Sequence, residues 1–569
     1  MEQITPNNEN WFSNIEAAKV IQSGSDINWD SEIDVIVVGL GGAGVACALQ
    51  SLEEGLSVIA IDRFEGGGAT VASGGVIYAG GGTSIQKEAG VEDDVDNMFN
   101  YLKLETGNIV SDETLRDFCQ QSAPTIDWMI GHGTDFRPTL FPKKTSYPAP
   151  QYFLYHSDNT LIAPYNQKAK PAARGHRGYV PPEQGKKAMN LGNALFDPLL
   201  DSAKQRGLDV MTNTEVRQLI LDSDGQVQGV KALRFSNDEK LSAYVTLREK
   251  AKNLLKKVPP VIPGSRVFLK RARKMQAQAE ELAAGREEVF IKARKGVMLS
   301  AGGFIFNKKM LNHYAPKYVG AYPLGTDGDS GAGIRLGQTA GGIADNMDRV
   351  TAWRFINPPL SFAKGLIVNK RGQRFINEMS YGATMGIELI ENQDGIGWLI
   401  LDKPLATQAL EDVKGDKALD FQRILAKIAV KFTAKKSKTL EGLASKIGIP
   451  AEALQNEITA YNAITSGDRS DPFLKTQDDV APILTPPFYA INVGVSAKML
   501  PLSTLTLGGL KVDEKTGAVM GESGPIKGLY AGGRNAVGVA SWLYVSGLSI
   551  ADGIYSGRRA ARAMANKIS

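Results

Sequence analysis

Cysteine and histidine are scarce in this chain of 569 residues. Cys47 and Cys119 are the two cysteines, which cannot build a disulfide framework or a CxxC metal site. The four histidines show no metal-like spacing. We therefore expect no bound metal, and a reduced, cytoplasmic compartment is the simplest interpretation.

Long apolar runs are also missing. The sequence has no run of about 18 or more apolar residues, so we expect no membrane-spanning helix. Residues 1–29 are polar and lack the apolar centre of a signal peptide, so no leader is expected. The net charge of +4 is small and gives no indication of nucleic-acid binding. Neither GxSxG nor a Cys/His nucleophile signature is present.

Glycine, in contrast, is abundant: the chain has 61, many of them in short clusters. Such clusters indicate close backbone approaches, as around a nucleotide. The chain is too long for a single hydrophobic core, so we expect two or more domains.

A strand, a glycine-rich turn and a helix are predicted near the N-terminus. Residues 33–38 read IDVIVV, which is typical of a strand buried on both faces. GLGGAG follows at residues 39–44, and an apolar helical pattern comes next. A second strand over residues 57–61 ends at Asp62. In such a unit the glycines let the backbone approach a pyrophosphate, and the acid accepts hydrogen bonds from the adenosine ribose.

Other glycine clusters favour FAD over NAD as the dinucleotide. GGGAT and SGG, at residues 66–70 and 73–75, lie just after Asp62 and suit a long cofactor that follows the backbone. Far downstream, GLYAGGR at 528–534 repeats the pattern of an apolar strand followed by glycines. A helix is expected to begin near Ser549, and its N-terminal amides would face the N1/O2 edge of the flavin.

With SAGGF at 300–304 and GTDGD at 325–329, these motifs resemble the fumarate reductase/succinate dehydrogenase flavoprotein superfamily over nearly the whole chain. The resemblance implies an α/β fold with a discontinuous Rossmann-type FAD-binding domain and an α+β cap domain over the substrate. Succinate dehydrogenases carry a flavin-linking His where this chain has Ala69, so the FAD is expected to be non-covalent.

The resemblance also implies which residues contact FAD. They are Gly39, Gly41, Gly42, Ala43, Gly44, Asp62, Arg63, Gly68, Ala69, Thr70, Ser73, Gly74, Gly75, Val216, Ala301, Gly302, Asp329, Gly533, Arg534, Ser549 and Ile550.

Two segments differ from the motifs of the superfamily members that act on dicarboxylates, and these differences indicate which branch of the superfamily the chain resembles. Those enzymes typically read HGANRLGG near the C-terminus, where Ala540 and Tyr544 here replace the His and Arg that hold carboxylates. A phenol suits an uncharged carbonyl instead. YVSGLS at 544–549 resembles the 3-ketosteroid dehydrogenases of the Δ4-(5α) type. The Δ1 type has a functional glycine where Leu548 stands here, which favours Δ4 over Δ1.

This resemblance implies desaturation of steroid ring A beside the C3 ketone. Such a reaction removes a proton from the α-carbon and a hydride from the β-carbon, so the carbonyl must be polarised. Tyr544 is the candidate carbonyl donor, Tyr381 the candidate proton-transfer residue, and Ser546 a relay or second donor. The alternatives stay open that the tyrosines only pack and that Ser546 caps the following helix.

Other functions stay open too: a Δ1-dehydrogenase, or a fumarate-reductase-like reductase or electron carrier. The expected partners are a steroid or similar apolar ketone and an electron acceptor that the sequence does not indicate. We expect a tail at 1–30 and a cap at 351–494. The FAD-binding domain is expected to comprise residues 31–235, 292–350 and 495–569.

A basic insertion, residues 236–291, fits neither domain. Thr246 to Met275 has ten Lys and Arg against one Glu, interleaved with apolar residues. This stretch carries +9, which leaves −5 on the rest of the chain. Prolines 259, 260 and 263 predict two short helices around an elbow. The segment is either a peripheral contact with an anionic membrane or a solvated charged excursion.

Overall fold

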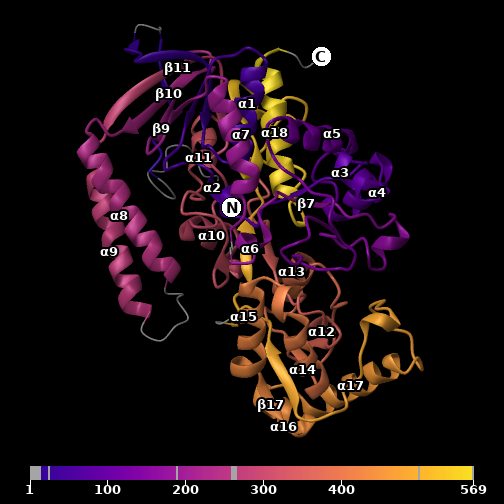
Figure 1. The fold of residues 1–569 in the computed structure, drawn as a ribbon. Coiled ribbons are helices and arrows are strands. Elements are labelled where there is room, and N and C mark those ends of the chain that lie inside the picture. The colour runs from indigo at the N-terminus through magenta and orange to yellow at the C-terminus, as the bar shows by residue number, and fades with distance from the viewer. Residues whose placement is uncertain (1–13, 23–25, 188–189, 258–264, 498–499, 567–569) are drawn as a thin grey trace.

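The computed structural model describes residues 14–22, 26–187, 190–257, 265–497 and 500–566. Figure 1 shows a larger part built on an extended sheet, a smaller part below it, and a helical hairpin standing to one side. The expected α/β architecture is confirmed.

The larger part is organised by a nine-stranded mixed sheet. Its parallel portion includes the predicted N-terminal strand, which is buried from Val35 to Val38, as its apolar sequence requires. The other portion is an antiparallel meander whose last strand is long enough to join both portions. The strands are β1 Lys19–Val20, β2 Ser31–Val38, β3 Val58–Ile61, β8 Asp209–Met211, β9 Glu215–Leu221, β10 Val227–Arg234, β11 Glu287–Leu299, β21 Ala518–Gly521 and β22 Gly524–Ala531.

Helices α1 (Gly42–Glu53) and α18 (Leu548–Met564) pack tightly together against this sheet. The contact is close because glycine faces it: a Cβ added at Gly557 would lie 2.2 Å from the carbonyl oxygen of Ala43. A large buried cluster surrounds the pair and extends to neighbouring helices and a small sheet. These helices and strands are α2 Gly68–Val71, α3 Ser84–Glu88, α4 Val95–Thr106, α5 Asp112–Gly131, α7 Asn193–Gln205, β4 Val76–Tyr78, β5 Leu140–Phe141, β6 Leu154–Tyr155 and β7 Gly175–Arg177. The short helix α6, Pro182–Gly185, precedes α7.

The smaller part has a four-stranded antiparallel sheet and its own buried core. That core also takes in Ile305 and Leu311, which come before the predicted cap, so the domain limits stay a prediction. The elements are α12 Leu360–Ala363, α13 Gly382–Asn392, α14 Lys403–Asp412, α15 Asp420–Ile428, α16 Leu440–Ile447, α17 Ala451–Thr465, β15 Leu366–Val368, β16 Trp398–Leu401, β17 Lys435–Ser437 and β18 Phe488–Asn492. Helix α10, Lys308–Tyr314, contributes to the cores of both parts.

Two small sheets are made of sequence-distant strands; the first lies at the junction of the parts, and the second, β13 with β20, packs against the core of the large sheet. In the first, β14 pairs antiparallel with β19, which returns from the smaller part, and β12 adds to its other edge. The chain therefore passes between the parts on paired strands. The strands are β12 Tyr322–Pro323, β13 Ala344–Asp345, β14 Val350–Trp353, β19 Ser503–Thr506 and β20 Gly509–Leu510; helix α11 Ala332–Thr339 precedes β13.

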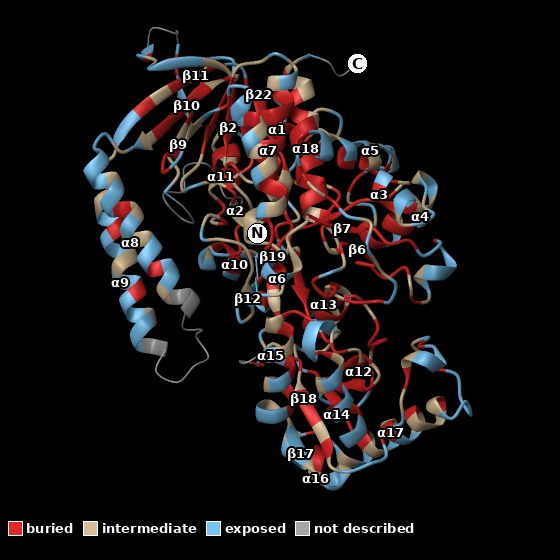
Figure 2. Ribbon diagram, viewed as in Figure 1, coloured by how far each residue is buried: buried red, intermediate tan, exposed pale blue. Residues whose placement is uncertain are grey.

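The basic insertion forms a hairpin of helices α8 (Asp238–Lys257) and α9 (Ser265–Ala283). The prediction of two short helices is wrong in length, because each helix continues beyond the basic stretch toward the sheet. The proline elbow, 258–264, lies outside the described residues. Exposed residues cover most of the hairpin (Figure 2). Across the described parts of the chain, no helix is both long and apolar enough to cross a membrane.

Close packing of α1 on α18 predicts that Gly557→Ala destabilises the protein. The added methyl group meets backbone atoms of α1, so the free energy of unfolding should fall by about 1–3 kcal/mol. Gly131→Ala is the matched control, since an added Cβ there meets no atom within 4 Å. That variant should be neutral or slightly stabilised. Thermal unfolding of both checks this, and equal midpoints would contradict it.

Candidate functional site

Three strands of the large sheet end at one edge. Leu299 at the end of β11 pairs with Val38 at the end of β2 and with Ala531 at the end of β22. The three strands are parallel, so the glycine turns that follow them meet at this edge. In open α/β sheets, ligands bind outside such carboxyl ends. Motifs separated by hundreds of residues thus form one site.

The first glycine turn requires glycine for steric reasons. Gly39 has φ +97°, and a Cβ there would lie 2.6 Å from the Cα of Ala301. A Cβ at Gly44 would lie 2.1 Å from the carbonyl oxygen of Gly39. The hydroxyl of Ser300 donates to that same oxygen over 2.8 Å. The turns after β2 and β11 are therefore in direct contact.

Open space remains in front of this turn. A Cβ built at Gly41 meets nothing closer than 4.0 Å, and one at Gly68 nothing closer than 3.8 Å. Gly41 caps α1 without a side-chain hydrogen bond, so the helix N-terminus is open to an anion. Thr70 accepts from the amide of Gly42 over 3.0 Å and fixes α2 beside it. This cradle fits the pyrophosphate of a dinucleotide.

Asp62, at the end of β3, also organises its own loop. Its carboxylate accepts from the amides of Leu40 and Phe64, both over 2.8 Å. Burial raises the pKa of Asp62, while these backbone N–H groups act in the opposite direction. A carboxylate has about four acceptor positions, so room remains for a ribose hydroxyl. The predicted ribose role is compatible with this second one.

Asp329 and Arg534 join two of the other motifs. The Arg534 guanidinium donates to the Asp329 carboxylate over 2.6 Å. Asp329 also accepts from the amides of Gly303 and Thr326, over 3.1 and 3.0 Å. Nη1 of Arg534 is buried without a partner among the described residues. A donor of this kind at the sheet edge fits an anionic or carbonyl-bearing cofactor.

The remaining predicted cofactor residues lie around the same edge or on segments that lead to it. Gly533 lies against Ala43, because a Cβ there would be 3.0 Å from that methyl group. Ala69 similarly lies close to Gly325. Ser73, whose hydroxyl accepts from the amide of Gly75, orders the turn before β4. The other positions are Gly302 after β11, Gly74 in the turn before β4, Arg63 after Asp62, Val216 buried in β9, and Ser549 and Ile550 in the first turn of α18.

The two candidate catalytic tyrosines come together from opposite parts of the molecule. Tyr381 precedes α13 of the smaller part, and Tyr544 precedes α18 of the larger part. Both belong to one apolar cluster with Trp353, at the end of β14. The Trp353 and Tyr544 rings meet edge to face at 4.8 Å. Two phenols inside an apolar enclosure suit recognition of a ketone in a hydrophobic substrate.

Ser546 connects Tyr381 to a third phenol. Its hydroxyl lies 3.1 Å from that of Tyr155 on β6 and faces Tyr381 as well. Ser546 does not cap the following helix, which was the alternative role for this residue. Gly547 is the N-cap of α18, with φ +86°, and has no side chain; the backbone N–H groups of Gly547 and Ser549 face the Tyr544 hydroxyl instead. A relay role therefore stays as the prediction for Ser546.

Burial makes both tyrosines weak acids. It raises the pKa of Tyr381 well above its ordinary value, and Tyr544 and Tyr155 add to the rise, while Ser546 and Trp353 act in the opposite direction. Burial also raises the pKa of Tyr544, opposed by hydrogen bonding from Ser549. Both phenols are therefore protonated donors at neutral pH. A proton can pass through Tyr381 only if its own proton leaves in the same step.

The larger part holds Tyr381 by its backbone. The Tyr381 amide donates to Oδ1 of Asn159 over 2.6 Å. The amide nitrogen of Asn159 donates to Glu105 and to Thr384, which lies in α13. Asn159 and Glu105 belong to the larger part, so the start of α13 is fixed against it.

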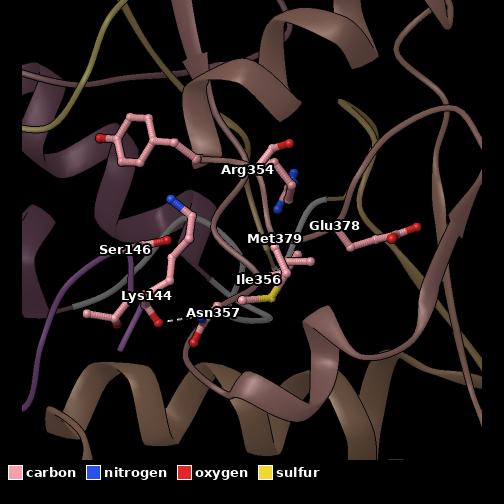
Figure 3. A pocket seen from close by; sticks show the side chains of 10 residues that line it. Lys144, Ser146, Arg354, Ile356, Asn357, Glu378 and Met379 are labelled. Atoms are coloured by element: carbon pink, nitrogen blue, oxygen red, sulfur yellow. Dashed lines mark hydrogen bonds between the residues drawn. The ribbon is translucent and has the colours of Figure 1, made fainter. Parts of the chain in front are cut away.

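A small cavity lies beside this junction (Figure 3). Lys144 and Ser146 line it from the larger part, and Arg354, Asn357 and Met379 from the segments before and after α12. The side-chain amide of Asn357 donates to the carbonyl of Lys144 over 2.9 Å. The cavity volume of about 10 Å³ has room for one water and none for a steroid.

Sequence reasoning missed Tyr155 and Trp353. Tyr155 lies on a two-residue strand, and Trp353 ends a four-residue one, so neither has a motif or periodicity around it. Nε1 of Trp353 is buried and faces the Tyr381 hydroxyl, where it opposes the rise in pKa that burial causes. Such a neighbour is visible only in the structure.

Known proteins resemble this chain over most of its length. A family model described as an FAD binding domain matches residues 34–550. The 3-oxo-5-alpha-steroid 4-dehydrogenase of Comamonas testosteroni is 35% identical over 526 residues, covering 90% of this chain and 94% of that protein. The 3-oxosteroid 1-dehydrogenase of Mycolicibacterium smegmatis is 26% identical, covering 88% and 92%.

A solved structure agrees in fold. The 3-ketosteroid-delta4-(5alpha)-dehydrogenase of Rhodococcus jostii RHA1, in complex with 4-androstene-3,17-dione, has a TM-score of 0.79 and 28% identity. The match covers 96% of this chain and 99% of that one. The resemblance drawn from the motifs is confirmed. The chain belongs to the FAD-binding flavoprotein family that includes the 3-oxo-5-alpha-steroid 4-dehydrogenase of Comamonas testosteroni.

Proposed function

We propose that this protein is an FAD-dependent 3-ketosteroid dehydrogenase of the Δ4-(5α) type. The observation that carries the proposal is the convergence of Tyr381, Tyr544 and Ser546 in one largely apolar site. The similarity to a 3-oxo-5-alpha-steroid 4-dehydrogenase over most of both chains supports the substrate class. When bound, FAD supplies the acceptor for the hydride taken from the substrate.

Tyr544 is the donor to the substrate carbonyl in this proposal. Loss of the α-proton places negative charge on the C3 oxygen, and a nearby hydrogen-bond donor lowers the energy of that charge. The raised pKa of Tyr544 keeps its proton in place at neutral pH. The Trp353 ring, packed edge to face against Tyr544, limits its rotation. A fixed donor needs little reorganisation during the reaction.

Tyr381 and Ser546 move the proton. Because burial keeps Tyr381 protonated, its oxygen accepts the substrate proton as its own proton passes to Ser546. Tyr155 is the next hydroxyl in line, 3.1 Å from Ser546. The indole N–H of Trp353 supports partial negative charge on Tyr381 during this transfer. The three hydroxyls thus form a short path away from the substrate.

The cofactor contacts implied by the resemblance are part of this proposal. The open cradle at Gly41 and Gly68 would hold the pyrophosphate, and the start of α18 would face the flavin N1/O2 edge. Ala69 offers no linking side chain, so we infer that FAD binds non-covalently. The smaller part would close over the substrate and exclude water.

Product analysis tests the proposed function. The protein should oxidise a 5α-3-ketosteroid in the presence of an artificial electron acceptor, giving a product two mass units lighter with a C4–C5 double bond. A C1–C2 double bond would identify the Δ1 alternative. Reduction of fumarate with no steroid oxidation would overturn the proposal in favour of a reductase.

Tyr544→Phe should lower kcat on the 5α-3-ketosteroid by about 100-fold or more. The substitution removes one hydroxyl and little volume, so FAD content and thermal stability should not change. Substrate binding should weaken much less, because the charge develops mainly in the transition state. Steady-state kinetics measures both. Near-normal kcat would show that Tyr544 only packs.

Tyr381→Phe provides the contrast because its defect should depend on pH. Wild-type kcat should rise with pH into the alkaline range, because a less protonated Tyr381 accepts the proton more readily and burial has moved its pKa upward. The Phe variant should be slow and lack that rise. Identical pH profiles in the two proteins would remove Tyr381 from the proton path.

For the outer end of the α8–α9 hairpin, we propose peripheral contact with an anionic membrane. Support comes from Val267 and Phe268, which are 71% and 42% exposed in the first turn of α9. Exposed basic residues lie near them on both helices of the hairpin. They are Lys250, Lys252, Lys270, Arg271, Arg273 and Lys274. Exposed apolar residues among basic ones are typical of segments that lie on anionic lipid. A steroid substrate would partition into such a membrane.

Charge reversal of Lys270, Arg271 and Lys274 to Glu should abolish sedimentation with phosphatidylserine vesicles. Each basic residue contributes about 1 kcal/mol at such a surface, so three reversals should reduce binding by about 100-fold or more. Reversal of Lys431, Lys435 and Lys438, exposed on the smaller part, is the control with equal charge and should retain binding. A wild-type protein that stays in the supernatant would show that the hairpin is a solvated excursion.

A further inference from the structure

The inner end of the α8–α9 hairpin packs on the FAD-binding part through Arg248. Its guanidinium stacks on the ring of Phe64, with 3.7 Å between the central carbon and the ring centroid. The same group donates to the carboxylate of Asp327 over 2.7 Å. The side chain is 16% exposed, so much of it is removed from water. One side chain of the insertion thus holds two separate loops.

Both loops carry predicted cofactor residues. Phe64 follows two residues after Asp62, and its amide donates to that carboxylate. Asp327 precedes Asp329 by two residues, and Asp329 pairs with Arg534. Arg248 therefore ties together the loops that position Asp62 and Asp329.

Opposite charges add a second connection between the hairpin and the sheet. Arg63 lies 3.6 Å from Glu215 at the start of β9 and 3.7 Å from Glu280 on α9. Arg286, just after α9, donates to Glu215 over 2.6 Å. Arg63 directly follows the predicted ribose ligand, so this cluster lies at the adenosine end of the site.

We propose that the inner end of the hairpin is a clamp for the adenosine half of FAD. Arg248, stacked on Phe64 and paired with Asp327, keeps the two loops together, and Arg63 joins them to α9. An arginine suits this task because its planar group can stack and donate at once, which lysine cannot do equally well. The inference depends on the FAD site and does not depend on the steroid.

Arg248→Ala should speed dissociation of FAD from the diluted holoenzyme by about tenfold, the usual scale for a largely buried cation–π contact with an ion pair. Recovery of free FAD fluorescence gives the rate. Arg248→Lys keeps the charge without the planar stack and should give an intermediate rate. Lys240→Ala is the control, on an exposed part of the same hairpin, and should dissociate like wild type.

Binding of half-ligands tests the location. Apoprotein made by acid release of FAD should bind ADP about tenfold more weakly in Arg248→Ala, while FMN affinity should not change. Unchanged FMN affinity is also the control for folding, because loss of the Arg248–Asp327 pair should lower the thermal stability of the variant. Equal loss of ADP and FMN affinity, or unchanged FAD dissociation, would overturn the clamp. These experiments measure cofactor binding and not steroid turnover, so their result can be interpreted even if the proposed function is wrong.

Discussion

The rest of the site depends on the parallel pairing of β11 with both β2 and β22. This pairing places the ends of three strands, separated by up to about five hundred residues of chain, at one edge of the sheet. The turns after β2 and β11 can approach only because Gly39 and Gly44 lack side chains. The α1–α18 contact through Gly557 then presents the N-termini of both helices toward that edge. A shift of one residue in either register would move every glycine out of place.

The reacting groups are arranged by a different constraint, which is the way the chain crosses between its two parts. Strand β14 leaves the larger part and β19 returns beside it, so Trp353 stands at the crossing. Tyr381 is attached to the smaller part but is held by Asn159 of the larger one. Tyr544 belongs to the larger part alone. The enclosure therefore forms only when both parts are together, which links exclusion of water to assembly of the proton path.

The features predicted most accurately are those that depend on residues close together in the sequence. The N-terminal strand, the glycine turn and Asp62 follow one another within thirty residues of chain, so their register could be predicted from local rules. The start of α18 was predicted within one residue for the same reason. Tyr155 and Trp353 could not be found, because their importance comes from tertiary neighbours and their strands are too short to show a period. The predicted lengths of the two hairpin helices were wrong, because they were taken from the limits of the basic stretch. Basic charge does not determine where a helix ends.

The hairpin shows how one insertion can serve two roles without conflict. Its outer cations are exposed, so each is strongly screened and contributes only near a charged surface. Arg248 and Arg286 at the inner end are instead partly or largely buried and already paired with Asp327 and Glu215. Breaking such pairs leaves an uncompensated buried charge, which costs far more than losing an exposed pair. Lipid at the outer end would therefore not compete for these inner arginines. The rigid helices between the ends keep the two environments apart, so contact with a membrane can leave the cofactor in place.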